Sequence, residues 1–506
     1  MSEPSPILPD FLIGFLEFSA YLFVFSIGLI VLWLAFLYVV DRAQTADAIR
    51  HNYPVIGRLR GLFLHLGKFF RQYFFAFDRE EMPFNRAQRE YVYRASRDED
   101  NTIAFGSTRH IQEPGSVLFV NCPYPKLDVE STEPEPVIIG PYCREPFEHA
   151  CIFNISGMSY GALSKPAVRA LSHGAHAAGC WLNTGEGGLS PWHLEGGAEL
   201  VFQIGTAKYG VRDEYGNLSD EKLREVAAHP QVRMFEIKLS QGAKPGKGGI
   251  LPAEKVTEEI ARIRGIPPHK PSLSPNRHPE IDSNDDLIGM IRRIRHVTGK
   301  PVGFKTVIGA WGWLDALFMR INELGPEQAA PDFITIDSAD GGSGAAPMTL
   351  MDYVGLPISE SLPLVIDRLE AHGLRERIRV IASGKLIDAG SVAWALCTGA
   401  DFVASARGFM FSLGCIQALQ CHRNTCPTGV TTHNPRLQTG LDPMEKAERV
   451  ASYARHIEHE VGVIAHSCGV RNPRELRRFH ARIVQADGSS IPLDELYDHK
   501  RLAERH

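Results

Sequence analysis

Eight short runs rich in β-branched and aromatic residues alternate with helical patterns from about residue 148 onward, and this alternation restricts the fold more than any other feature. The candidate strands span 150–156, 180–185, 200–205, 234–240, 302–308, 333–338, 379–384 and 402–407. Strands separated by helices pair in parallel, and eight such units close into a (β/α)8 barrel of about 250 residues. We therefore predict an α/β chain built around a TIM barrel.

Three neighbouring strand ends are followed by loops that are rich in glycine or carry a positive charge, and such loops form the ligand-binding mouth of a barrel. The loop after the sixth run reads "DGGSGAAP" (340–347), and the next two runs are followed by Ser383, Gly384 and Lys385 and by Ala406, Arg407 and Gly408. Glycines let backbone N–H groups approach an anion, while Lys385 and Arg407 supply countercharge. The loops predict a phosphorylated ligand, with purely structural turns as the alternative.

Lys305 lies within an otherwise apolar strand, "PVGFKTVIG". An unpaired ammonium is costly in such surroundings, so the side chain should face the barrel mouth and meet a negative partner. In a flavin enzyme this partner is the edge of the isoalloxazine ring that becomes anionic on reduction. The alternative is a structural ion pair with a carboxylate such as Glu236 or Asp337.

Three of the nine cysteines, Cys415, Cys421 and Cys426, lie in "GCIQALQCHRNTCPTGV" (414–430), whereas the other six are scattered singly. This scatter argues against a disulfide framework. The spacing lacks the paired knuckle of a zinc site, but three thiolates in a loop that continues with a proline suit an iron–sulfur cluster. We predict a three-iron cluster, or a four-iron cluster with one other ligand; the alternative is a set of small buried thiols.

Residues 19–40, "SAYLFVFSIGLIVLWLAFLYVV", contain no charge and are long enough to span a bilayer as a helix. Residues 1–18 lack the Lys or Arg of a signal peptide, whereas Arg42, Arg50 and further basic residues follow the apolar run. The positive-inside tendency predicts a single pass through the inner (cytoplasmic) membrane, with the catalytic part facing the cytoplasm. The formal net charge is −5, and nothing in the composition suggests nucleic-acid binding.

Six motifs follow one another along the body of the chain. They are "SGMSYGALS" (156–164), "NTGEGG" (183–188), "QIGTAKYGV" (203–211), "KLSQGAKPGKGG" (238–249), "ITIDSADGGSGAAP" (334–347) and the cysteine run. In this order they resemble the FMN-binding synthase domain of glutamate synthase, over about residues 148–432. The resemblance implies a TIM barrel with FMN across its mouth and, beside it, a 3Fe-4S cluster on the three cysteines.

The resemblance also implies a role for individual residues. FMN would contact Ser156, Gly157, Met158, Ser159, Gln203, Lys305, Gly341, Gly342, Ser343 and Gly344, besides the loops after the seventh and eighth strands. Lys244 would bind the carboxylates of 2-oxoglutarate, and Glu186 would orient the substrate or shuttle a proton. Lys305 would stabilise the reduced flavin.

The implied activity is that of an oxidoreductase acting on CH–NH2 donors, which reduces 2-iminoglutarate, formed from 2-oxoglutarate and ammonia, to L-glutamate. The chain begins "MSEPSP" and offers no amidotransferase cysteine and no G-x-G-x-x-G after a strand. We therefore expect a glutaminase partner or free ammonium, and an electron donor that is ferredoxin-like or an NAD(P)H reductase subunit. The alternatives are an amino-acid or amine dehydrogenase that feeds electrons to a membrane carrier, and an inactive barrel that serves as a scaffold.

Four segments are expected along the chain. They are a membrane anchor (1–45), an N-terminal extension (46–147), the FMN-binding barrel (148–432) with the iron–sulfur loop, and a helical C-terminal extension (433–506). Residues 265–283 are too rich in proline and polar residues for a regular element, so they should form a long excursion near the mouth.

Overall fold

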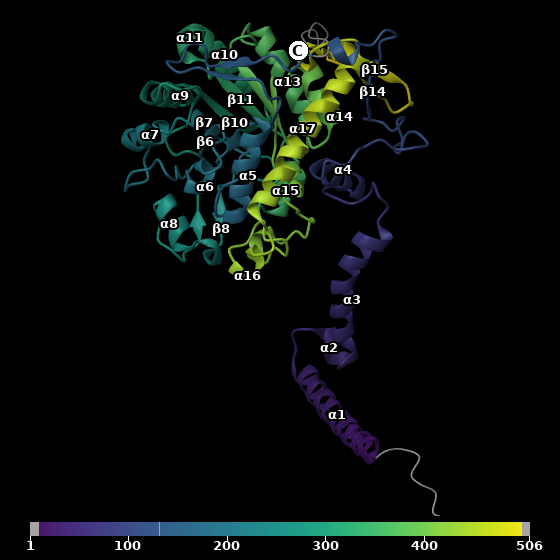
Figure 1. Ribbon diagram of the computed structural model, residues 1–506. Helices are drawn as coiled ribbons and strands as arrows, with labels where there is room; N and C mark the ends of the chain where they lie inside the picture. Colours follow the sequence, from purple (N-terminus) through teal and green to yellow (C-terminus); the bar gives the residue numbers. More distant parts are fainter. Residues whose placement is uncertain (1–9, 131, 498–506) are drawn as a thin grey trace, which may run out of the picture. The chain divides into compact units, whose positions relative to one another are not determined.

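Eight parallel strands close into a barrel in the second of the two units of the chain (Figure 1). The computed structural model describes residues 10–130 and 132–497; the first unit ends at Ala87 and the second begins at Gln88. The barrel strands are β4 (Phe153–Ile155), β5 (Leu182–Asn183), β6 (Leu200–Ile204), β7 (Val232–Lys238), β10 (Val302–Val307), β11 (Phe333–Asp337), β12 (Arg379–Ser383) and β13 (Phe402–Ser405). They pair in chain order and β13 returns to β4, which confirms the predicted TIM barrel.

Helices alternate with the strands and cover the barrel. The longer ones are α5 (Lys165–Ala178), α7 (Asp220–Ala227), α9 (Asn284–Thr298), α10 (Gly312–Leu324), α13 (Ile358–Ala371) and α14 (Ala389–Thr398). Their starts follow the capping rule, since Ser164, Ser219, Ser283 and Asp388 each accept a hydrogen bond from a free N–H of the first turn. The shorter ones are α6 (Pro191–Leu194), α8 (Glu258–Arg264), α11 (Pro326–Ala329), α12 (Met348–Tyr353), α15 (Arg407–Ser412) and α16 (Pro435–Gln438).

The C-terminal region is part of the same unit. Helix α17 (Pro443–Ser467) lies beside α5 and α14, and the ring of Tyr453 contacts Phe153 and Phe409 at 5.5 and 5.2 Å between centroids (Figure 1). Beyond it, β14 (Ala481–Val484) pairs with β15 (Ser490–Pro492) and with β1 (Val117–Phe119), and α18 (Leu493–Leu496) follows. The segment predicted as a helical extension therefore contains strands as well as a long helix.

The N-terminal end of the barrel is closed by an apolar plug. Strands β2 (Val137–Ile139) and β3 (Phe147–His149) form an antiparallel ribbon, and Ile139 and Phe147 belong to one buried cluster with Trp181, Phe333 and Phe402. The last three side chains stand at or just before the starts of barrel strands. Since this end is filled, the opposite end remains for a ligand.

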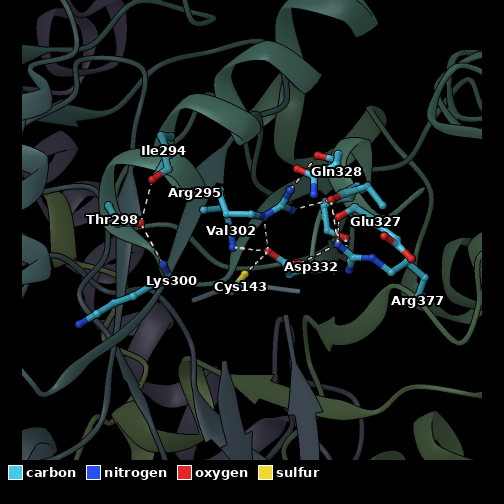
Figure 2. A network of polar contacts seen from close by, with 12 residues as sticks. Cys143, Ile294, Arg295, Thr298, Lys300, Val302, Glu327, Gln328, Asp332 and Arg377 are labelled. Atoms are coloured by element: carbon cyan, nitrogen blue, oxygen red, sulfur yellow. Dashed lines mark hydrogen bonds and ion pairs between the residues drawn. The ribbon is translucent and has the colours of Figure 1, made fainter. Parts of the chain in front are cut away.

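A buried carboxylate ties the same end of the barrel together (Figure 2). Asp332 accepts hydrogen bonds from the backbone N–H of Val302 (2.8 Å), from Arg295 Nε (3.0 Å) and from Arg377 Nη2 (2.9 Å), and the Cys143 thiol lies 3.4 Å from Oδ2. A buried charge is tolerated when it is paired and hydrogen-bonded in this way. The network joins α9, β10 and the chain before β11 and β12. It thereby holds the starts of three neighbouring strands, whose other ends form the mouth, in fixed relative positions.

The excursion at 265–283 is partly regular. Strand β9 (Ser272–Leu273) pairs antiparallel with β8 (Ile250–Leu251), so the prediction of no regular element was wrong here, because pairing with a distant segment overrides local composition. The excursion lies near the strand ends as expected. His278 Nε2 donates to the carbonyl of Lys238 at 3.1 Å, and Thr206 Oγ1 donates to the carbonyl of Pro275 at 2.7 Å.

The first unit is helical. Helix α1 (Asp10–Ala43) contains the predicted 19–40 segment, and Phe11–Ala43 is long and apolar enough to cross a membrane, with a mean hydropathy of 2.7. It is followed by α2 (Ala48–Asn52), α3 (Ile56–Phe70) and a π-helical turn, η1 (Arg71–Phe75). Asp41 holds the turn after α1, because its carboxylate binds the guanidinium groups of Arg50 and Arg58, each at 2.7 Å.

Candidate active site at the barrel mouth

Side chains and backbone from several strand ends line one cavity at the C-terminal mouth of the barrel. Ten of the residues predicted to contact the cofactor are among them: Ser156, Gly157, Gln203, Lys305, Gly342, Ser383, Gly384, Lys385, Ala406 and Arg407. They come from the ends of β4, β6, β10, β12 and β13 and from the loop after β11. The closed barrel thus brings together loops that are up to 251 positions apart in the chain, from Ser156 to Arg407.

Six other predicted positions do not line this cavity: Met158, Ser159, Gly341, Ser343, Gly344 and Gly408. Gly408 has a packing reason to be glycine, since a Cβ there would lie 2.3 Å from the Tyr453 hydroxyl oxygen. Met158 and Ser159 lie against Gly185, where an added Cβ would be 2.4 Å from the backbone nitrogen of Ser159. The contacts of these residues with a ligand stay a prediction.

Sequence reasoning missed five lining residues: Lys238, Gln241, Asp337, Ser405 and Ile387. Lys238 gave the same signal as Lys305, a positive charge near the end of an apolar strand, "MFEIKLS". Gln241 lies in the "KLSQGAKPG" motif, and its Nε2 donates to the carbonyl of Gly342 at 3.0 Å. The loops after β7 and β11 are therefore in contact across the mouth.

Glu236 organises the polar interior just below the cavity. Its carboxylate accepts hydrogen bonds from Asn183 Nδ2 (2.8 Å), Gln203 Nε2 (2.7 Å) and Thr335 Oγ1 (2.5 Å), and it is 2% exposed. These partners come from β5, β6 and β11, while Glu236 itself lies on β7. A buried acid needs such donors to stay ionised without a large cost.

Lys305 takes part in this charged layer. Its Nζ lies 3.3 Å from Asp337 Oδ2, so the structural ion pair considered from the sequence is present, and both side chains also line the cavity. Burial lowers the pKa of Lys305, but the charges of Asp337 and Glu236 raise it, and the net shift is upward. Lys305 therefore presents a permanent positive charge to whatever occupies the cavity.

The loops after β11, β12 and β13 form a positively charged corner. Lys385 Nζ lies 3.0 Å from Asp340 Oδ2, and Arg407 Nη2 donates to the main-chain carbonyl of Asp340 at 2.9 Å. Burial lowers the pKa of Arg407 to about 10, which still leaves it charged at neutral pH. Both cations line the cavity next to the Asp340 loop, so the corner offers two positively charged donors to an anionic ligand.

Glycines at this corner let the loops that line the cavity pack closely against their neighbours. Gly384 has φ +111°, and a Cβ there would lie 2.4 Å from the Cβ of Ser338. A Cβ on Gly342 would lie 2.9 Å from Arg407 Nε, and one on Gly157 would lie 2.8 Å from Gln203 Nε2. Backbone that approaches this closely, next to Lys385 and Arg407, fits a phosphorylated cofactor.

The two residues predicted for the substrate, Glu186 and Lys244, come together beside the cavity. Glu186 Oε1 lies 2.8 Å from Lys238 Nζ. Burial raises the pKa of Glu186, but Lys238 and Lys244 lower it, with a net shift to about 2. Burial lowers the pKa of Lys244 to about 8, while the charge of Glu186 opposes that shift. The buried Arg264 adds to the positive potential at Glu186, so this charged cluster beside the cavity suits a ligand with carboxylates.

Cys415, Cys421 and Cys426 line a second pocket, together with Pro427 and Thr428. In residues 10–130 and 132–497, no three His, Cys, Asp or Glu side chains converge on a single metal ion. The three predicted ligands nevertheless line the same pocket, and the cluster itself stays a prediction. Burial raises the pKa of the Cys415 thiol to about 12 and also raises that of Cys421, whereas for Cys426 burial is outweighed by donors from Thr428 and Thr431, which leave its pKa lowered.

Comparison with known proteins agrees with this geometry. A family model described as a conserved region in glutamate synthase matches residues 109–471. The chain belongs to the glutamate synthase family. Membership supports the predicted enzyme class, an oxidoreductase acting on CH–NH2 donors, and FMN as its cofactor.

Similar proteins include one of nearly the same length. The glutamate synthase large subunit-like protein YerD of Bacillus subtilis (strain 168) is 39% identical over 94% of this chain and 98% of its own. The archaeal glutamate synthase [NADPH] of Methanocaldococcus jannaschii is 35% identical over 64% of this chain, but the match spans only 60% of that protein. Among solved structures, the flavin-binding domain of baker's yeast flavocytochrome b2 is 15% identical, with a TM-score of 0.46 over 81% of this chain and 83% of that domain.

The role of the Gly384 loop in FMN binding can be tested by adding one methyl group. Gly384→Ala should lower the amount of FMN bound per protein and weaken rebinding at least about tenfold, because the new Cβ meets Ser338 and the backbone has a positive φ. Flavin released by heat and fluorescence titration of the apoprotein would measure both. Gly390→Ala is the matched control, since its Cβ would meet only Asp388 Oδ1 at 3.4 Å. Full FMN binding by Gly384→Ala would contradict the proposal that the Gly384 loop holds FMN.

Proposed function

We propose that this protein is a membrane-tethered oxidoreductase of glutamate synthase type that reduces 2-iminoglutarate to L-glutamate with FMN and an iron–sulfur cluster. The observation that carries the proposal is the position of Lys238, which lines the cavity proposed for FMN and also forms an ion pair with Glu186. A substrate held by Lys244 would therefore lie next to the flavin. FMN supplies hydride transfer when bound, and a cluster supplies single electrons.

The charges around Glu186 give each residue a role. Lys244 and Lys238 would bind the two carboxylates of the substrate, because both ammonium groups face Glu186 inside the protein. Glu186 is ionised at neutral pH, so it would stabilise the positively charged iminium nitrogen and orient it. Lys305, whose pKa is raised, would hold negative charge at the reduced flavin. Relatives named glutamate synthase [NADPH] support NADPH as the ultimate electron source, delivered through a reductase partner.

The substrate assignment predicts a defined pH profile. Because the pKa of Lys244 is lowered to about 8, its positive charge is complete well below that pH and is lost as the pH rises through it. The kcat/KM for 2-oxoglutarate, with a fixed concentration of free ammonia and a chemical reductant, should therefore fall above about pH 8. Lys244→Arg should move this fall to higher pH, since guanidinium stays charged. Lys244→Met should lower kcat/KM about 10- to 100-fold below pH 8, and the difference from wild type should shrink above that pH, where the wild-type lysine has itself lost its charge.

The same assay decides between substrates. Flavin reoxidation by 2-oxoglutarate with ammonium would support the proposal. If only other oxo acids reoxidised the flavin, the product would be an amino acid other than glutamate. Flavin reduction by an amino acid or amine, without reoxidation by 2-oxoglutarate, would favour a dehydrogenase that feeds a membrane carrier. If the pH dependence of kcat/KM were the same in wild type and in Lys244→Arg, the proposed role of Lys244 in substrate binding would be refuted.

The cluster has a direct chemical test. Cys421→Ser should lose most iron and acid-labile sulfide but still bind FMN, because the thiols line a different pocket from the FMN cavity. Cys122→Ser is the control, since Cys122 lies outside the cysteine pocket and a serine can keep its hydrogen bond to the Tyr124 carbonyl. Unchanged iron in purified Cys421→Ser would reject these ligands.

The tether can be separated from the chemistry. A chain that begins at Asp41 keeps the carboxylate that binds Arg50 and Arg58, yet lacks nearly all of the apolar helix. The full chain should stay in the membrane pellet after alkaline carbonate extraction, with its N-terminus intact by mass spectrometry, because a helix of this length spans the hydrocarbon core. The shortened chain should leave the pellet and turn over equally fast with a soluble reductant. If carbonate released the full chain from the membrane, or if the helix were cleaved off as a signal sequence, the proposal of a membrane tether would be contradicted.

A further inference from the structure

We propose that Lys255 is a positioning residue that joins the FMN loop to the cysteine loop and places a buried positive charge beside the cluster. The proposal rests on the proposed iron–sulfur cluster. Lys255 ends a short 3-10 helix, η3 (Ala253–Lys255), and is only 2% exposed. Neither the motifs nor the spacing of the cysteines indicated a role for it.

The ammonium of Lys255 bridges two segments that are far apart in the chain. Its Nζ donates to the carbonyl of Ala162 at 3.0 Å and to the carbonyl of Cys421 at 3.2 Å. Ala162 follows Ser156 and Gly157, which line the FMN cavity, by only a few residues. Cys421 lines the cysteine pocket. One buried cation therefore contacts the loop of each proposed cofactor site.

Uncharged contacts hold the same two loops together. His433 Nε2 donates to the carbonyl of Gly161 at 2.8 Å, and the backbone N–H of Ser164 donates to the carbonyl of Val430 at 2.9 Å. The turn between them is tight, since Gly161 has φ +107° and its N–H donates to the carbonyl of Leu163 at 3.1 Å. We call these contacts, together with the Lys255 bridge, the loop clamp.

Lys255 brings an ammonium group to the loop clamp, whereas His433 brings none: burial lowers the pKa of Lys255 to about 8, which still leaves most of it protonated at neutral pH. Burial lowers the pKa of His433 to about 4, so its ring is neutral at physiological pH and donates only a hydrogen bond. A positive charge near an iron–sulfur cluster favours its reduced and more negative form, and so raises its reduction potential. The clamp would thus fix the relative position of the two cofactors, while Lys255 alone would also tune the cluster.

Three variants separate the two effects in the intact membrane-extracted protein. Lys255→Met removes the charge and the bridge, Lys255→Arg keeps the charge, and His433→Phe removes a hydrogen bond but keeps the ring, which lies 6.0 Å from that of Tyr160. Lys270→Met, at an exposed lysine, is the control. Iron and sulfide content, a redox titration of the cluster followed by electron paramagnetic resonance, and hydrogen exchange of peptides covering 159–164 would be measured for each.

Lys255→Met should lower the cluster potential and speed exchange of 159–164 about fivefold, as expected for the loss of about one hydrogen bond. Lys255→Arg should restore most of the potential. His433→Phe should speed exchange but leave the potential unchanged, and the control should change neither. An iron-loaded Lys255→Met with wild-type potential and exchange would overturn the proposal.

Loss of iron by Lys255→Met is also decisive. If Lys255→Arg then retains the cluster with nearly the wild-type potential, the charge requirement is supported. If both variants lack iron, tuning by charge is overturned and Lys255 is only structural. Wild-type protein without iron and sulfide would instead refute the cluster of the proposed function, and with it the tuning, while exchange would still decide whether the clamp exists.

Discussion

The mouth of the barrel depends on one buried carboxylate, Glu236, and the groups that neutralise it. Its donors come from β5, β6 and β11, so a single acid fixes the ends of strands that contribute separately to the cavity. A buried acid that lost these partners would cost several kcal/mol, roughly 3–5, because its charge would be uncompensated. The strands can therefore vary little in register here, and Gln203 is held at one position in the cavity wall.

This layer also explains how Lys305 can serve two purposes. Glu236 and Asp337 keep the ammonium charged when the cavity holds no ligand, so the lysine needs no flavin to be stable. Lys385 and Arg407, in contrast, are both held by contacts with Asp340. An anionic cofactor thus meets cations that are already oriented, and little side-chain entropy is lost on binding.

The sequence predicted the barrel well because parallel strands buried on both faces form apolar runs of recognisable length. It predicted Lys305 because a charge interrupts such a run, and the same reasoning applied to "MFEIKLS" would have found Lys238. Contacts between distant segments were not accessible in this way. The bond from Lys255 to Cys421 joins residues 166 positions apart, and the pairing of β8 with β9 depends on a partner that local composition does not reveal.

The short segment after β4 links the two proposed redox sites. Ser156 and Gly157 line the FMN cavity, while Gly161 and Ala162 accept hydrogen bonds from His433 and Lys255 at the cysteine loop. Because the turn between them is closed by its own backbone hydrogen bonds, a displacement at one end would be transmitted to the other instead of being absorbed. The segment therefore connects the mouth cavity to the cysteine pocket as a short spacer that has its own backbone hydrogen bonds.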